Sequence, residues 1–359
     1  MTNPAQHEAP DWHEALWLRT RFGSLEVGEA PVPAPGPSEV VVRARAVAVN
    51  PVDAMNGIAR RVVYPWLSYP AVLGSDVAGE VVAVGDGVTT LAVGDRVAGF
   101  AVGAERSRDS PAEGAFQSHV TLLATLCARL PDTLSFEDAS VLPLALTTAA
   151  AGLFEADQLG LELPALGGPA RGTTVLVLGA ATSVGMNAVQ LARSAGHRVV
   201  ATASLGNAGL LRELGAESVV DYHDADAVDQ LVRILDGHDL VGTLAVAGGS
   251  LPIALALDRA RGVGGRRRIA SAHPTPVTAL RAALARRRGV HVSAIWGGSP
   301  KDTAVGPAVW NDYLPAALAD GRHRAAPEAR VVGHGLAAIP EALARLRAGA
   351  RAEKFVVTL

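Results

Sequence analysis

Apolar and polar positions follow different patterns in the two parts of this chain. Up to about residue 135, short apolar runs at 40–49, 77–84 and 96–100 are separated by turns rich in glycine, proline and aspartate. Apolar runs of this length between turn signals are typical of β-strands. We therefore expect the N-terminal part of the chain to be β-rich.

From there to about residue 300, apolar runs of strand length alternate with helical segments. The helical part opens with a helix-start signal, Ser135-Phe-Glu-Asp138. The runs expected to form strands are 175–178, 199–202, 218–220, 243–246, 265–270 and 290–295. Alternation of this kind predicts a doubly wound α/β fold, in which helices cover both faces of a parallel sheet.

These patterns predict two domains. Residues 138–310 are expected to form the doubly wound domain, and residues 1–137 the β-rich domain. A helix at 339–348 and a strand at 354–359 follow, and we expect the segment 311–359 to rejoin the β-rich domain.

The start of the doubly wound domain predicts a nucleotide site. A strand at 174–178 runs into a turn of small residues, and a helix from Val184 to about Ala195 leads to a second strand at 198–201. This is the opening of a Rossmann dinucleotide-binding unit, in which backbone N–H groups at the helix N-terminus favour a pyrophosphate. The alternative to a nucleotide site is an ordinary strand–turn–helix without a ligand.

The glycine fingerprint of this turn is imperfect. Gly179 suits the tight turn, and Gly185 suits close packing of the helix on the strand. The middle glycine position is filled by Ala181, Thr182 and Ser183. Small side chains still let a phosphate approach, and the two hydroxyls can donate to it. We expect the turn from Gly179 through Val184 to Gly185 to bind the cofactor.

The end of the second strand favours NADP(H) over NAD(H). NAD-binding proteins usually place an acidic residue here to hold the ribose 2′-OH, but the segment 201–207 contains no acid. Ser204 and Asn207 can instead hydrogen-bond a 2′-phosphate. The arginine or lysine expected beside such a phosphate is absent at this position.

Composition narrows the classes of function. The net charge is −3, so the chain lacks the excess of positive charge that is typical of proteins that bind nucleic acid or an anionic membrane. A single cysteine, Cys127, excludes a disulfide framework and a multi-cysteine zinc site, and the ten histidines show no metal-ligand spacing. No apolar run is long enough to span a bilayer, so we expect a soluble, cytoplasmic protein without a metal site.

Several motifs in order along the chain resemble the medium-chain dehydrogenases/reductases. They are Asn50-Pro-Val-Asp53, Gly74-Ser-Asp-Val-Ala-Gly79, Gly114-Ala-Phe-Gln117, the nucleotide turn and Leu214-Gly-Ala216. The resemblance implies a GroES-like catalytic domain joined to the Rossmann domain. Zinc enzymes of this superfamily carry a cysteine near position 50 and Gly-His-Glu where this chain has Gly74-Ser75-Asp76. The chain is therefore similar to the zinc-independent branch of quinone oxidoreductases and trans-acting polyketide enoyl reductases.

This resemblance implies an NADPH-dependent reductase in secondary metabolism. Its substrate would be an activated C=C bond in an enone, enal, quinone or enoyl thioester, either small or bound to an acyl carrier. Enoyl reductases of this group usually have a lysine two residues after the NPVD aspartate, where this chain has Met55. That departure leaves open an imine or iminium substrate, and a non-catalytic NADPH-binding protein is a third hypothesis.

The resemblance also implies three catalytic residues. It places Asn50 and Thr147 near the nicotinamide, and it gives Tyr64 the role of a pocket tyrosine that donates a proton after hydride addition. Each has a plainer alternative. Asn50 can be a turn residue before Pro51, Thr147 a core-helix residue bonded to backbone, and Tyr64 a packing aromatic.

Further residues are expected around the ligands. In relatives a tyrosine at the position of Tyr222 reaches the adenosine 2′-phosphate. The substrate pocket is expected to include Met55, Trp66, Phe100 and Trp296. The resemblance leaves two assemblies open, a monomer and a homodimer paired through the edge strand at 290–295.

Overall fold

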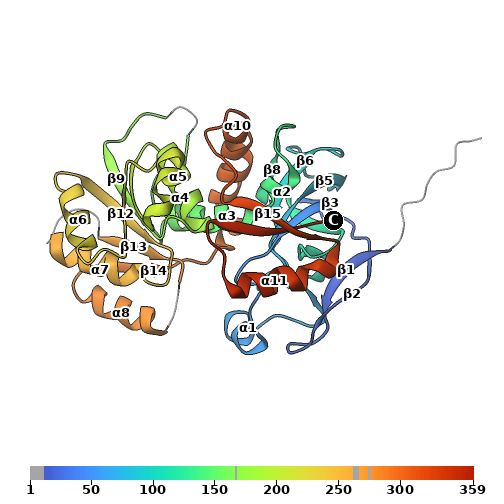
Figure 1. Ribbon diagram of the computed structural model, residues 1–359. Coiled ribbons are helices and arrows are strands. Elements are labelled where there is room, and N and C mark those ends of the chain that lie inside the picture. The colour runs from blue at the N-terminus through green and yellow to red at the C-terminus, as the bar shows by residue number, and fades with distance from the viewer. Residues whose placement is uncertain (1–11, 166–167, 262–266, 274–275) are drawn as a thin grey trace, which may run out of the picture.

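The computed structural model of the protein describes residues 12–165, 168–261, 267–273 and 276–359. The chain forms two lobes side by side (Figure 1), and a GroES-like β-rich lobe and a Rossmann lobe are each built around a sheet. The predicted fold class is confirmed. The boundaries 137/138 and 310/311 stay predictions.

The Rossmann lobe is built on a six-stranded parallel sheet with the order β11-β10-β9-β12-β13-β14. In chain order its strands are β9 (Thr173–Leu178), β10 (Arg198–Thr202), β11 (Ser218–Val220), β12 (Asp239–Ala245), β13 (Arg268–Ser271) and β14 (His291–Ala294). All six lie at predicted positions, although the first two residues of the predicted strand 265–270 lie outside the described residues.

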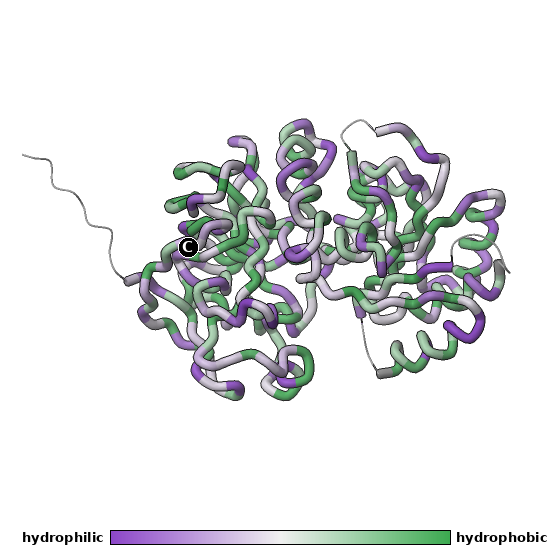
Figure 2. Tube along the Cα trace, turned by 180° about the vertical axis from the view of Figure 1, so that it is seen from behind, coloured by the Kyte–Doolittle hydropathy of each residue, from purple (hydrophilic) through white to green (hydrophobic). Residues whose placement is uncertain are grey.

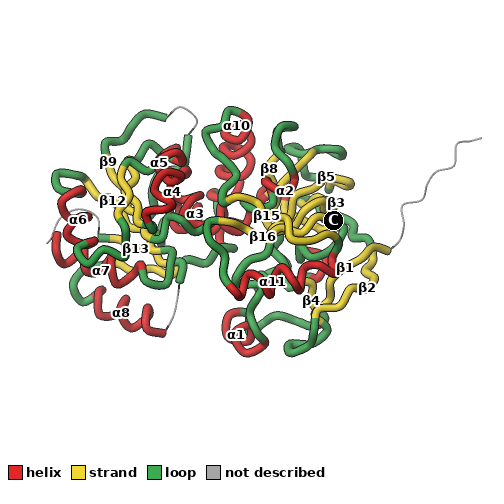
Figure 3. The backbone as a smooth tube through the Cα atoms, viewed as in Figure 1, coloured by secondary structure: helices red, strands yellow, loops and turns green. Residues whose placement is uncertain are grey.

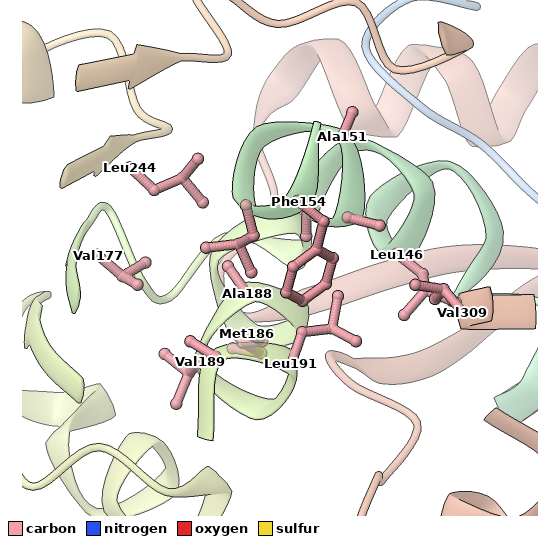
Figure 4. Packing of buried hydrophobic residues seen from close by; sticks show 14 of the residues in the cluster. Leu146, Ala151, Phe154, Val177, Met186, Ala188, Val189, Leu191, Leu244 and Val309 are labelled. Carbon is pink, nitrogen blue, oxygen red and sulfur yellow. The ribbon is translucent and has the colours of Figure 1, made fainter. Parts of the chain in front are cut away.

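Helices cover both faces of this sheet, as Figure 3 shows for α4, α6 and α7. The sheet alternates its side chains, so Val175 and Val177 pack in one core while Leu176 and Leu178 pack in the other. Figure 4 shows the first core, where Val177 faces α3 and α4. The helices are α3 (Pro143–Phe154), α4 (Ser183–Ser194) and α5 (Ala208–Leu214) on one face, and α6 (Ala227–Ile234), α7 (Ser250–Arg261) and α8 (Pro276–Arg286) on the other.

The β-rich lobe contains a seven-stranded sheet and a three-stranded sheet. The larger one follows the order β15-β16-β3-β5-β6-β8, with β7 also paired to β3. Its strands are β3 (Glu39–Ala48), β5 (Asp76–Val84), β6 (Arg96–Phe100), β7 (His119–Leu123), β8 (Cys127–Arg129), β15 (Glu328–His334) and β16 (Glu353–Thr358). The smaller sheet consists of β1 (Trp12–Leu18), β2 (Leu25–Pro31) and β4 (Ala71–Val72).

The last part of the chain closes this lobe. Helix α11 (Ile339–Ala348) leads into β16, which pairs antiparallel with β3. Figure 2 shows hydrophobic segments in the interior of each lobe. The remaining short helices are α1 (Gly57–Val63), α2 (Phe136–Ala139), α9 (Val305–Pro307) and α10 (Leu314–Ala319).

Candidate active site

A cavity of about 520 Å³ lies between the two lobes and is lined by residues from both. Eight of the predicted site residues line it: Asn50, Met55, Tyr64, Phe100, Thr182, Ser183, Val184 and Trp296. The loop after β3, the loop after α1, the start of α4 and the loop after β14 therefore meet at one place. A concave, mostly apolar site with a few polar groups is the usual form of a small-molecule binding site.

Asn50 is held at this cavity by a buried ionic network. Its side-chain Nδ2 donates to Asp76 Oδ2 at 2.8 Å, and its backbone N–H donates to Asp53 Oδ2 at 2.8 Å. Asp76 is fully buried and pairs with Lys354 Nζ, which also donates to the carbonyl of Val141 at 3.0 Å. The amide of Asn50 is thus fixed in orientation and does not rotate freely.

Two aromatic rings, of Tyr64 and Trp296, line one side of the cavity, and a third, of Trp66, packs against both. Tyr64 and Trp66 follow α1, and Trp296 follows β14, so the two lobes both contribute. The ring centroids are 5.7 Å apart for Tyr64 and Trp296, 5.9 Å for Tyr64 and Trp66, and 6.0 Å for Trp66 and Trp296, all edge to face. Such pairs are favourable beyond their buried area. We call these three residues the aromatic wall; Trp66 supports the other two from behind, outside the lining residues.

The nucleotide turn opens directly into the cavity. Thr182 caps α4, because its Oγ1 accepts the N–H of Gly185 at 3.1 Å and donates to the carbonyl of Gly179 at 2.9 Å. A Cβ added to Gly185 would lie 2.5 Å from the Gly179 carbonyl oxygen, and Gly179 has φ of +80°. Only glycine suits both positions. The turn therefore brings backbone N–H groups at a helix N-terminus to the cavity, which fits a pyrophosphate.

Comparison with known proteins agrees with this architecture. Residues 36–132 match the alcohol dehydrogenase GroES-like domain. The chain is 42% identical to the dehydrogenase pigH of Monascus ruber, over 97% of this chain and 99% of that protein. The chain belongs to the medium-chain dehydrogenase/reductase family. The resemblance predicted from the motifs is confirmed.

Other members of the family resemble this chain over its length. The trans-enoyl reductase himH of Aspergillus japonicus is 34% identical, covering 97% of both chains. The structure of a quinone oxidoreductase from Pseudomonas syringae superimposes with a TM-score of 0.69 at 25% identity, covering 97% of this chain and all of that one. As a medium-chain dehydrogenase/reductase with a Rossmann domain, the protein is an oxidoreductase whose fold implies a nicotinamide cofactor, NAD(H) or NADP(H).

In this reductase fold Thr147 does not reach the cavity. Its side chain is fully buried, donates to the carbonyl of Pro143 at 2.9 Å and accepts the Nε1–H of Trp310 at 3.2 Å. The next residue, Thr148, lines the cavity instead. Successive residues of a helix point about 100° apart, so a neighbouring threonine faces a different direction. The sequence motif contains both threonines, and nothing in it indicates which of the two faces the cavity.

The predicted 2′-phosphate residues lie together, beyond the cavity lining. Asn207 Nδ2 donates to Ser204 Oγ at 3.0 Å after β10. Tyr222 follows the neighbouring strand β11 and stacks on His223, with 4.0 Å between ring centroids. Asp221, the residue before Tyr222, had no predicted role. Its carboxylate accepts the N–H groups of His223 at 2.9 Å and Leu205 at 3.2 Å, which hold its pKa below the usual range.

A buried carboxylate that the sequence did not single out also lines the cavity. Glu105 accepts the Nε1–H of Trp296 with both oxygens, at 3.0 and 2.9 Å, and lies 3.4 Å from Lys301 Nζ. Among the described lining residues it is the one with a full charge when histidine is neutral. Its segment, Gly103-Ala-Glu-Arg106, looks like any polar loop.

Two titratable groups of this region, the buried Asp53 and the partly buried Tyr64, have shifted pKa values. Burial is the main cause that raises the pKa of Asp53 to about 7; the negative Asp76 acts in the same direction, whereas Asn50 and Lys354 act in the opposite one. Burial likewise raises the pKa of the Tyr64 phenol, with the nearby acids Asp53 and Glu105 acting in the same direction. Tyr64 therefore keeps its proton at neutral pH.

In the part of the chain that the structure describes, no helix is long and apolar enough to cross a membrane.

Proposed function

We propose that the protein is an NADPH-dependent reductase of activated C=C bonds in uncharged, conjugated acceptors. The observation that carries this proposal is the shared cavity, where the start of α4 meets a fixed Asn50 and a protonated Tyr64. The names of relatives support the reaction class, since himH is a trans-enoyl reductase and the Pseudomonas syringae protein a quinone oxidoreductase. The acceptor is proposed to be small or bound to an acyl carrier.

The residues proposed to hold the coenzyme follow from their places in the fold. Backbone N–H groups and the Ser183 hydroxyl at the start of α4 suit the pyrophosphate, with Thr182 acting as the helix cap. Ser204, Asn207 and Tyr222, which lie at the ends of the neighbouring strands β10 and β11, suit the adenosine end. When bound, the coenzyme supplies a hydride to the acceptor.

The chain's own residues serve the acceptor. An N–H of Asn50 can donate to a carbonyl oxygen on which negative charge develops, and its fixed orientation avoids a reorganisation cost. Tyr64 can donate the proton that completes the reduction. Tyr64 and Trp296 of the aromatic wall give the acceptor an apolar surface and keep water away from the reacting carbon.

We also propose that this chemistry needs no zinc. Asp76 occupies the position of the acid in the zinc enzymes' Gly-His-Glu motif, and here it is neutralised by Lys354. Within the described ranges, no three His, Cys, Asp or Glu side chains gather as a metal site requires.

The test is an acceptor panel with purified protein and either NADPH or NADH. We expect trans-2-hexenal, 2-cyclohexen-1-one or crotonyl N-acetylcysteamine thioester to consume NADPH faster than NADH. Asn50→Ala should lower kcat/KM on the order of 100-fold, the usual loss when one oxyanion donor is removed. Unchanged turnover in that variant, or no acceptor reduced by the wild type, would contradict the proposal.

An imine or iminium acceptor is the second candidate, and Glu105 favours it. A carboxylate beside aromatic rings can attract a cationic acceptor, and Glu105 has one cation near it in the described residues, Lys301 at 3.4 Å, which does not line the cavity. Adding 2-methyl-1-pyrroline to the panel separates the two classes. Faster turnover of the pyrroline than of any enal or enone would favour imine reduction.

A further inference from the structure

We propose that Asp53 supplies the proton that Tyr64 gives to the acceptor, through one water molecule held in a small cavity under the active site. This inference rests on the proposed function, because it concerns the proton half of that reduction. Asp53 acts through Tyr64 and does not itself touch the acceptor.

The small cavity has the size and the walls for this task. Its volume is about 20 Å³, which is enough for one water molecule. Four of its lining residues carry polar side chains, Asp53, Arg60, Tyr64 and Ser75, and the others are apolar residues or glycine. A buried water needs two to four polar partners, and these residues provide them.

The small cavity borders the active-site cavity directly. Val52, Tyr64, Ser75 and Ala104 line both spaces. Tyr64 is the one of these four residues with an acidic side-chain proton, so it can pass a proton between the two spaces, while Asp53 lines only the small cavity. This arrangement suits a proton path from Asp53 through the water to Tyr64.

Asp53 is held in place by the NPVD turn. Its Oδ2 accepts the N–H of Asn50 at 2.8 Å, and its side chain is almost completely buried. The turn thus aims the carboxyl group at the small cavity without exposing it to solvent.

Burial, more than the charged neighbours, sets the pKa of Asp53 at about 7, which suits a proton donor at neutral pH. Asp76 acts in the same direction as burial, whereas Asn50 and Lys354 oppose it. Arg60, across the small cavity, directs its guanidinium to the carbonyls of Met55 at 2.6 Å and Arg21 at 3.3 Å. On the other side, Tyr64 is protonated.

The proton transfers balance. Reduction of a conjugated C=C bond adds a hydride to the β-carbon, supplied by the coenzyme as it is oxidised, and leaves an enolate on the acceptor. The Tyr64 O–H gives its proton to the α-carbon, forming the second new C–H bond. The phenolate then takes a proton from the water, the water takes one from Asp53, and solvent reprotonates the Asp53 carboxylate before the next turnover.

The kinetic test compares wild type with Asp53→Asn on the most active acceptor of the panel. We expect wild-type kcat to fall above about pH 7 and the variant to show a flat pH profile, with kcat lowered on the order of 100-fold at pH 6 and KM changed little. Asp53→Asn combined with Tyr64→Phe should be no slower than Tyr64→Phe alone. Asp132→Asn, at an exposed turn, is the matched control and should behave as wild type.

A second readout needs no turnover. Because the pKa of Asp53 is higher in the folded chain, at about 7, than in the unfolded chain, at about 4, the folded state binds the extra proton between these two pH values. The difference in unfolding free energy between wild type and Asp53→Asn, measured in urea, should therefore fall steadily as pH rises from about 4 to about 7 and stay constant above that. A difference that does not change over this pH range means an ionised Asp53 and overturns the inference.

The outcomes separate the two proposals. Turnover by wild type with an equally steep pH profile in Asp53→Asn overturns this inference and leaves the proposed function standing. Failure of the wild type on every acceptor overturns the proposed function, and the inference with it.

Discussion

Asn50 depends on two residues that are far away in sequence. It donates to Asp76, and Asp76 is paired with Lys354, 278 residues later, with both members of the pair buried. The NPVD motif can be recognised in the sequence, but it does not indicate which residues far along the chain will contact Asn50. Long-range polar contacts of this kind depend on the finished fold, and therefore sequence patterns do not predict them.

Breaking this ion pair should destabilise the fold. Asp76→Asn leaves the ammonium of Lys354 buried without its counter-charge, which we expect to cost about 3–5 kcal/mol of unfolding free energy. Urea unfolding measures the loss. The double variant Asp76→Leu with Lys354→Met should be less destabilised than either single change, because it removes both charges. A double variant as unstable as the sum of the singles would argue against the pair.

His323 predicts how the protein responds to acid. Burial lowers the pKa of His323 to about 3, and the ring contacts Asn187 at 3.0 Å and Tyr313 at 3.3 Å. The unfolded chain binds a proton at His323 near pH 6.5 while the folded one does not, so stability falls as pH drops from about 6.5 to 3, by up to about 5 kcal/mol. His323→Gln should flatten this slope of urea stability against pH. His334→Gln, at an exposed histidine, is the control and should keep it.

At the scale of elements, periodicity predicted the regular parts well. The strands of the Rossmann sheet and the helix at 339–348 were found because each buries an apolar face against the core. Strand β15 was not predicted, since it is largely exposed and its sequence, Glu-Ala-Arg-Val-Val-Gly-His, shows no regular alternation. Its position is set by pairing with β16.

The N-terminus of α4 offers a test that separates stability from binding. Thr182→Val removes the helix cap and should cost about 1 kcal/mol of stability. Ser183→Val should leave stability nearly unchanged and weaken NADPH binding about tenfold, because a bulky side chain replaces a donor beside the pyrophosphate. Fluorescence titration with NADPH measures the affinity of each variant. If a variant with both Thr182→Val and Ser183→Val binds NADPH as tightly as the wild type, this turn is not part of the cofactor site.

At the scale of the whole molecule, the two lobes are joined at the cavity by Glu105. The carboxylate comes from the β-rich lobe and holds Trp296 and Lys301, which follow the Rossmann sheet. No local pattern marks this contact, because the loops that make it have no periodicity. The sequence motifs thus predict which segments line the cavity. They do not predict its charge and shape, because these depend on how the two lobes pack together.

Gly298 tests this junction. A Cβ at this position would lie 2.1 Å from Glu105 Oε1, so Gly298→Ala must push the carboxylate away from Trp296. We expect altered tryptophan fluorescence and KM for the acceptor raised about tenfold, with kcat less affected. Gly206→Ala, where a Cβ meets nothing within 4 Å, should change neither quantity. A normal fluorescence spectrum in Gly298→Ala would mean that Glu105 does not position the indole.

The pairing of β16 with β3 has a consequence for how the protein is made. Asp76 leaves the ribosome 278 residues before Lys354, the cation that neutralises it. Until then, β3 has an unpaired edge and Asp76 lacks its counter-ion, whereas the whole Rossmann sheet has already been synthesised. The β-rich lobe is therefore translated first but completed last. During biosynthesis the Rossmann lobe can fold before the β-rich lobe and support it while β16 pairs with β3.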